Sequence, residues 1–149
     1  MRQHAIISNI QTLDCANACV RIPTERQSTM KTYQGSCHCE AVVFEIETQF
    51  TEFTKCNCSL CTKKNAVMTK VHERQFKLLK GANSLGSYQW NMRIAKHHFC
   101  KDCGIYVFHR KRVTPDYFGV NVYCLNDVDI SNVPILEVDG VSMTTDKNA

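Results

Sequence analysis

Seven of the ten cysteines in this 149-residue sequence are grouped at spacings that suit metal coordination. Cys37 and Cys39 stand two positions apart, so on an extended segment both thiols share a face and point at one ion. Cys100 and Cys103 enclose a two-residue gap, and Gly104 then supplies the permissive backbone of a zinc knuckle. The two pairs together predict a closed tetrahedral zinc site of four thiolates, whose binding free energy contributes to folding.

The other three cysteines of this set, Cys56, Cys58 and Cys61, come from one short segment. Cys56 and Cys58 share a face, and Cys61 returns after a turn. Structural zinc sites usually have four protein ligands, whereas three ligands leave a position for water or substrate. An incoming thiol that takes this position binds as a thiolate, because the ion lowers its pKa. We therefore predict a structural site and a second, open zinc site with a catalytic role.

Other interpretations of the cysteines remain open. Cys124 could complete the second site as a fourth ligand, although an isolated cysteine after a strand is more often a small buried apolar residue. Some of the seven could form disulfides, and four thiolates can also bind iron, although zinc is the usual ion at such knuckles. Cys15 and Cys19 form an isolated C-x-x-x-C pair, which we interpret as incidental.

Four motifs occur in an order that resembles the glutathione-dependent formaldehyde-activating enzyme family, which also includes centromere protein V. They are Gly35-Ser36-Cys37-His38-Cys39, Cys56-Asn57-Cys58-Ser59-Leu60-Cys61, His98-Phe99-Cys100-Lys101-Asp102-Cys103-Gly104 and Asn121-Val122-Tyr123-Cys124-Leu125. The resemblance covers residues 31–130. The family often has arginine at the position of Tyr123, so the chain departs from the pattern there.

The resemblance implies a zinc-containing, mostly β fold of the β-tent type in a single domain. It implies the same division of the seven cysteines into a four-cysteine structural site and a three-cysteine catalytic centre. The implied activity is that of a carbon–sulfur lyase, an S-hydroxymethylglutathione synthase that condenses formaldehyde with glutathione. We therefore expect two Zn²⁺ ions as cofactors and a small-molecule thiol such as glutathione as the partner.

Several polar side chains near the motifs are candidates for binding or proton transfer. His98 could act as a proton shuttle, although a structural strand histidine is more common, and His97 would face the opposite side. The Lys63-Lys64 pair could meet the carboxylates of a glutathione-like ligand, and Arg110-Lys111-Arg112 could contact an anion. Both runs are more typical of solvated turns. Asn57, between two ligands, could support them by a hydrogen bond or belong only to a turn.

The segments that carry these residues are predicted to be short β-strands. We expect strands at 41–47, 66–71, 75–79, 84–90, 96–99, 105–109 and 118–123. In the first of them Val42, Phe44 and Ile46 share one apolar face. One helical turn is expected at 59–65, with Ser59 as its cap. Short strands separated by Gly and Asn turns predict an all-β sandwich or open barrel.

Length and composition favour one globular domain, because 44% of the residues are hydrophobic and 21% are charged. The polar residues 1–29 are expected to be a flexible N-terminal extension or the result of a misplaced start, with Met30 as the alternative start and 30–149 as the zinc domain. No apolar run suits a membrane span, and no secretory signal is visible. Clustered cysteines in metal-ligand spacings then favour the cytoplasm.

Two functions are consistent with these features. The leading prediction is a zinc enzyme that forms or breaks the carbon–sulfur bond of a thiol–aldehyde adduct. The alternative is a zinc-stabilised binding module with two structural sites that contacts protein or nucleic acid. The net charge of +4 is modest and no interleaved aromatic and basic residues occur, so nucleic-acid binding has little support. The sequence does not specify an oligomeric state.

Overall fold

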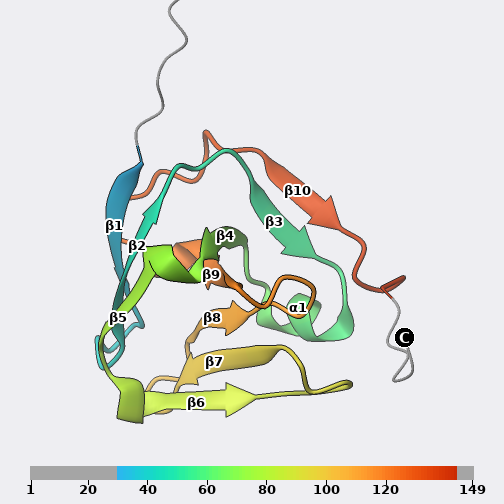
Figure 1. The fold of residues 1–149 in the computed structure, drawn as a ribbon, viewed down its shortest axis with the longest axis horizontal. Helices are drawn as coiled ribbons and strands as arrows, with labels where there is room; N and C mark the ends of the chain where they lie inside the picture. The colour runs from blue at the N-terminus through green and yellow to red at the C-terminus, as the bar shows by residue number, and fades with distance from the viewer. Residues whose placement is uncertain (1–29, 144–149) are drawn as a thin grey trace, which may run out of the picture.

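Two β-sheets pack against each other across a buried core in residues 30–143, the part of the chain that the computed structural model describes (Figure 1). The predicted mostly β, single-domain class is confirmed. The expected flexible extension and the Cys15–Cys19 pair lie outside the described residues. Among helices in the described part, none is long and apolar enough to cross a membrane.

The smaller sheet has three antiparallel strands in the order β1-β2-β5. They are β1 (Lys31–Ser36), β2 (Val43–Thr48) and β5 (Phe76–Lys80). Val42, Phe44 and Ile46 are fully buried, whereas the alternate residues of β2 are partly exposed, as expected from their alternation. This face of β2 therefore anchors the small sheet to the core.

The larger sheet has seven strands in the order β10-β3-β4-β9-β8-β7-β6. They are β3 (Phe53–Cys56), β4 (Met68–His72), β6 (Leu85–Tyr88), β7 (Lys96–Cys100), β8 (Tyr106–Arg110), β9 (Tyr117–Asn121) and β10 (Ile135–Val138). All neighbours are antiparallel except β10, which pairs with β3 in parallel. The short helix α1 (Ser59–Lys64) connects β3 to β4, and Figure 1 shows it inside the curve of the sheet.

Aromatic rings fill the space between the two sheets. The ring of Phe108 on β8 lies with its centroid 4.7 Å from that of Phe76 and 6.3 Å from that of Phe44, both on the small sheet. Phe76 also meets Phe118 of β9, at 4.7 Å. Such pairs contribute about 0.5–1.5 kcal/mol each beyond their area burial. The cluster fixes the position of β8, whose other side chains reach the candidate site.

The predicted strands are confirmed with shifts of a few residues, but three strands were not predicted. β1 contains Gly35, β3 is only four residues long, and β10 is an edge strand with largely exposed side chains. None of the three shows a long apolar alternation. Ser59 as the helix cap is wrong, because the N-cap is Cys58, whose sulfur accepts the N–H of Cys61. Three short 3₁₀ turns complete the described elements: Glu73–Gln75, Ala82–Ser84 and Val122–Cys124.

Candidate metal centres and the adjoining pocket

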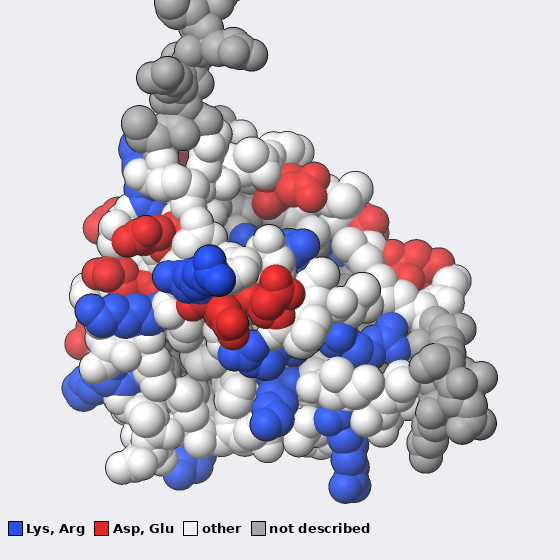
Figure 2. Space-filling model, in the orientation of Figure 1, with Lys and Arg blue, Asp and Glu red and all other residues white. Residues whose placement is uncertain are grey.

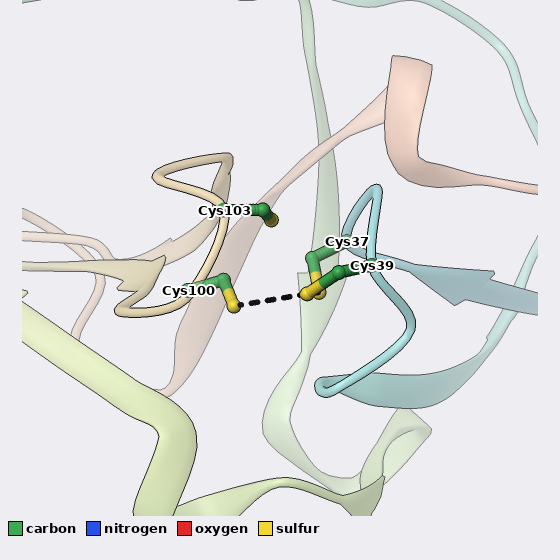
Figure 3. Close-up of side chains that lie close together, drawn as sticks. All are labelled: Cys37, Cys39, Cys100 and Cys103. Atoms are coloured by element: carbon green, nitrogen blue, oxygen red, sulfur yellow. Dashed lines mark hydrogen bonds between the residues drawn. The ribbon is translucent and has the colours of Figure 1, made fainter.

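The first four predicted ligands come together from two loops that are far apart in the sequence. Cys37 and Cys39 lie between β1 and β2, and Cys100 and Cys103 lie at the β7–β8 turn. Figure 3 shows the four thiols pointing toward one another. Their sulfur atoms all lie within 4.8 Å of one another. The structure therefore groups the residues as the sequence analysis predicted.

The spacing of these sulfur atoms fits a tetrahedral zinc ion. Zinc–sulfur bonds of about 2.3 Å place the sulfurs of a tetrahedron about 3.8 Å apart. The Sγ atoms of Cys37 and Cys39 are 3.6 Å apart, and those of Cys39 and Cys100 are 3.7 Å apart. A set of soft thiolate donors in this geometry suits zinc. The residues present therefore fit the ion that the family resemblance implies.

Backbone hydrogen bonds hold both loops in their ligand-presenting shapes. The N–H of Val42 donates to Cys37 Sγ at 3.3 Å, and the N–H of Cys37 donates to the Val42 carbonyl at 3.0 Å. At the knuckle, the N–H of Gly104 donates to the Cys100 carbonyl at 2.9 Å. Gly104 has a φ of 75°, which confirms the need for a permissive residue there. The backbone N–H of Ile105 lowers the pKa of Cys103 to about 6, which favours the thiolate.

The second group is local. Cys56 ends β3, Cys58 caps α1 and Cys61 lies in the first turn of α1, and their sulfurs lie within 4.8 Å of one another. The N–H of Cys58 donates to Cys56 Sγ and the N–H of Cys61 donates to Cys58 Sγ, both at 3.5 Å. Within residues 30–143, no fourth Cys, His, Asp or Glu joins this group. The geometry thus provides three protein ligands and one free side.

Cys124 does not belong to either group. Its buried thiol donates to the carbonyl of Tyr106 at 3.6 Å, and burial raises the pKa of this thiol to about 12. The alternative in which Cys124 is the fourth ligand is therefore wrong for this geometry. The side-chain amide of Asn121 donates to the same carbonyl at 2.9 Å, so both residues fix the backbone of Tyr106.

The three-cysteine group is electrostatically suited to a cation. Burial raises the pKa of Cys61, and the charges of Cys56 and Cys58 raise it further. Three adjacent thiolates repel one another when no positive charge compensates them. A bound divalent ion removes this penalty, because it stabilises all three deprotonated thiols at once.

The C-terminal segment packs directly against the three-cysteine loop. The amide of Asn57 donates to Asp139 Oδ1 at 3.1 Å, while Asn57 Oδ1 accepts the N–H of Val141 at 3.0 Å. A Cβ atom on Gly140 would lie only 2.3 Å from Cys56 Sγ, so a side chain does not fit there without a shift. The predicted supporting hydrogen bond of Asn57 is thus present. Its partner, the segment after β10, was not predicted.

A pocket of about 210 Å³ opens beside Cys56 and Cys61. Three basic residues, Lys64, Lys111 and Arg112, line it. Lys64 Nζ lies 3.5 Å from the centroid of the Tyr106 ring, and burial lowers the pKa of Lys64 to about 8. This arrangement favours an anionic ligand. On the face drawn in Figure 2, acidic side chains lie mainly over the upper strands and the left edge, and the lower part is basic.

The preferred interpretation of the two basic runs as solvated turns is therefore wrong for these three residues. Lys64 points into the pocket because α1 turns its last residue toward β8, whereas Lys63 is exposed. Lys111 and Arg112 follow β8 and lie on the pocket wall. Tyr123, at the position where the family often has arginine, is 61% exposed and does not line the pocket.

Of the two adjacent histidines, His97 and not His98 faces the pocket. His97 Nδ1 is 3.1 Å from the hydroxyl of Tyr106, and this hydroxyl is 2.6 Å from His109 Nδ1. His98 lies on the other side and packs against the ring of Phe108, with centroids 4.9 Å apart. The structural interpretation of His98 therefore agrees with its contacts. Tyr106 and His109 were not predicted as site residues.

Burial, together with the charge of Lys64, lowers the pKa of His97 to about 4 and that of His109 to about 3. Burial likewise raises the pKa of Tyr106. All three side chains are therefore uncharged at neutral pH. They form an uncharged, hydrogen-bonded part of the pocket wall, and Lys64 lies over the Tyr106 ring.

Residues 32–137 match the family described as glutathione-dependent formaldehyde-activating enzyme. The chain belongs to this family. The crystal structure of a Rhodobacter sphaeroides protein has a similar fold, with a TM-score of 0.64 and 37% sequence identity over 69% of this chain and 99% of that chain. Both cysteine groups lie inside the matched range of the glutathione-dependent formaldehyde-activating enzyme family, whereas Asp139 and Gly140 lie beyond it.

Proposed function

We propose that this protein is a zinc-dependent enzyme that forms or cleaves the carbon–sulfur bond of a thiol–aldehyde adduct, as an S-hydroxymethylglutathione synthase does. The observation that carries this proposal is the open side of the three-cysteine group, beside a pocket lined by basic residues. Family membership supports the same reaction class. In this proposal the four-cysteine group holds a zinc ion with a purely structural role.

The three-cysteine group is the proposed catalytic centre. A zinc ion held by Cys56, Cys58 and Cys61 supplies a coordination position that binds the substrate thiol as its thiolate. The hydrogen bonds at 3.5 Å within the loop and the packing of Gly140 on Cys56 keep the three sulfurs in place. The chain thus holds a ligand set that is complete on the protein side and accessible from the pocket.

The basic residues of the pocket are proposed to select the thiol. Lys64, Lys111 and Arg112 line this pocket, so they attract a substrate with negative charge near its thiol. Glutathione carries two carboxylates and meets this requirement.

The reaction itself needs two proton transfers. In the direction of synthesis, the thiol sulfur bonds to the aldehyde carbon, the C=O π bond breaks, and the oxygen becomes a hydroxyl. The thiol loses a proton and the oxygen gains one, so the pocket must accept a proton and return one. Cleavage reverses both transfers.

Exchange spectroscopy tests the proposal. Zinc-loaded protein is added to [¹³C]formaldehyde and glutathione at equilibrium, and NMR measures the rate of interconversion with the adduct above the uncatalysed rate. We expect acceleration by the wild type, loss of it in Cys58→Ala and full retention in Ser59→Ala, an exposed neighbour. No acceleration by the wild type would refute the enzymatic proposal. Salt-dependent binding of duplex DNA by the same sample would then favour the binding module.

A further inference from the structure

We propose that His97, Tyr106 and His109 form a proton relay that carries the proton of the substrate thiol to the aldehyde oxygen. The inference rests on the proposed function, since it assigns the proton transfer of that reaction. The three side chains all line the pocket that also contains Cys56 and Cys61. No other chain of hydrogen-bonded titratable side chains lines this pocket within residues 30–143.

The hydrogen-bond geometry determines where the hydrogens of this chain lie. The Tyr106 hydroxyl has one hydrogen, yet its oxygen is within hydrogen-bond distance of two imidazole Nδ1 atoms, at 3.1 Å for His97 and 2.6 Å for His109. The hydroxyl must therefore donate to one ring and accept from the other. The ring that donates carries its hydrogen on Nδ1 and has a bare Nε2. The other ring accepts at Nδ1 and carries its hydrogen on Nε2.

This arrangement gives the chain one acceptor end and one donor end. Among the described residues, neither Nε2 atom has a hydrogen-bond partner. Neither Nε2 atom is fully buried. Both are therefore available to water or substrate. Because both imidazoles are neutral at pH 7, the two opposite tautomers are the only arrangement that satisfies all three hydrogen-bonding atoms.

A proton crosses the chain without a change in its total charge. The bare Nε2 takes the thiol proton, the Nδ1 hydrogen of that ring moves to the Tyr106 oxygen, and the Tyr106 hydrogen moves to the second Nδ1. The second Nε2 then gives its hydrogen to the oxygen of the former aldehyde. One proton has left sulfur and one has reached oxygen, and the tautomers have exchanged. Exchange with pocket water restores the starting tautomers.

The fold supplies specific support for each member of the relay. His97 and His109 are direct register partners on β7 and β8, with ring centroids 5.0 Å apart. The register shifts between His98 and Phe99, and such a bulge re-aims neighbouring side chains, which brings Tyr106 to both rings. The ring of His109 lies over Gly119, where a Cβ atom would be 2.3 Å from His109 Cε1. A larger residue at 119 leaves no room for this ring position.

The relay also lies close to the proposed thiol site. Lys64, three residues after Cys61, places its Nζ over the Tyr106 ring. The charged or titratable groups around the relay are Lys64, His98 and Lys111, together with the three cysteines. Lys64 and Lys111 bring positive charge to this wall, which disfavours protonated imidazoles and keeps the chain in its neutral, transferring form.

The test combines a spectroscopic and a kinetic readout on full-length, zinc-loaded protein. Nitrogen-15 NMR of histidine-labelled protein reports the tautomer of each ring, independently of any activity. We expect one Nδ1–H ring and one Nε2–H ring in the His97–His109 pair, or one averaged shift for both if they exchange rapidly. In Tyr106→Phe we expect this complementarity to be lost. Two identical, non-exchanging tautomers in the wild type would overturn the relay.

The kinetic readout uses the same variant. Tyr106→Phe keeps the ring beneath Lys64 but removes the hydroxyl. We expect the rate of catalysed exchange to fall by about 100-fold, and we expect the solvent deuterium isotope effect on that rate to decrease. Tyr117→Phe is the matched control, because Tyr117 also contacts a histidine ring, at 5.0 Å, and a lysine, at 4.1 Å. Equal loss in both variants, or full activity of Tyr106→Phe, would contradict the relay. An inactive wild type would refute the proposed function, while the tautomers still decide the relay.

Discussion

The two cysteine groups of this protein use the same ligand chemistry, but the chain encloses them in different ways. The four-cysteine group joins the β1–β2 loop to the β7–β8 turn, and Cys37 and Cys100 are almost fully buried. The three-cysteine group comes from one turn, and all three of its cysteines are partly exposed beside a pocket. Under the proposed function, the sequence separation of the ligands, and not their type, distinguishes the scaffold site from the reactive one.

This difference has an energetic basis. An ion that joins distant segments closes a long loop, which is unlikely in the unfolded chain, so its binding stabilises the folded state strongly. An ion held by neighbouring residues closes almost no loop. Its loss therefore affects the pocket more than the fold. The following predictions test this contrast, beginning with the largest effect.

The largest effect is expected from Cys100→Ala. Removal of one buried ligand opens the four-thiolate site, and structural zinc sites of this kind contribute about 10–16 kcal/mol of apparent binding free energy. This is as large as the usual stability of a whole domain, about 5–15 kcal/mol. We expect circular dichroism to show an unfolded chain at 25 °C. A cooperative thermal transition like that of the wild type would contradict a scaffold role.

Cys58→Ala is expected to disable the three-cysteine group and leave the four-cysteine group intact. The variant should lose one zinc ion per chain by elemental analysis, because two thiolates bind zinc weakly. Its thermal transition should remain cooperative, since the four-cysteine group and the core are untouched. We expect a loss of stability of about 1–3 kcal/mol, typical of a single substitution. Unfolding equal to that of Cys100→Ala would remove the distinction.

Gly140→Ala tests whether the segment after β10, which lies beyond the residues that match the family, holds the three-cysteine group in place. The new methyl group would lie 2.3 Å from Cys56 Sγ, so the sulfur or the C-terminal segment must move. Changes next to metal ligands cost about 10–100-fold in metal affinity. We expect competition with a chelator to show such a loss for one zinc ion only. Val141→Ala, at an exposed neighbour, is the control and should behave as the wild type.

The last prediction is a pH dependence that arises from the histidines of the pocket. Burial holds the pKa values of His97 and His109 at about 4 and 3, below the value of about 6.5 in the unfolded chain. At pH values between the folded and the unfolded pKa, the unfolded chain binds more protons than the folded protein. The free energy of unfolding therefore falls as the pH drops below about 6.5. We expect a slope of about 1 kcal/mol per pH unit for each ring. In His109→Gln the slope should be halved between pH 6.5 and 5, with zinc content checked throughout.

The Cys37–Cys39 and Cys100–Cys103 pairs and the three-cysteine group could be predicted from the sequence because the spacing within each of them is local. Two residues that alternate on a strand, or a C-x-x-C turn, have nearly the same geometry in any fold. The buried face of β2 was predictable for the same reason, since Phe44 and Ile46 alternate with polar residues.

The remainder of the site depends on pairings that no local pattern encodes. His97 meets His109 only through the β7–β8 register, and the bulge that turns Tyr106 toward them breaks the simple alternation. The contact of Gly140 with Cys56 requires the parallel pairing of β10 with β3. Lys111 looked like part of a solvated charge run, and only the closure of the sheet places it at the pocket.

Native mass spectrometry of the zinc-loaded protein with and without glutathione tests the central claim most directly, because it counts metal ions and bound thiols on the same molecule. We predict two zinc ions per wild-type chain and one bound glutathione when the thiol is added. In Cys58→Ala we predict one zinc ion and no bound thiol. A single zinc ion in the wild type, or glutathione bound equally to Cys58→Ala, would contradict the open three-cysteine site.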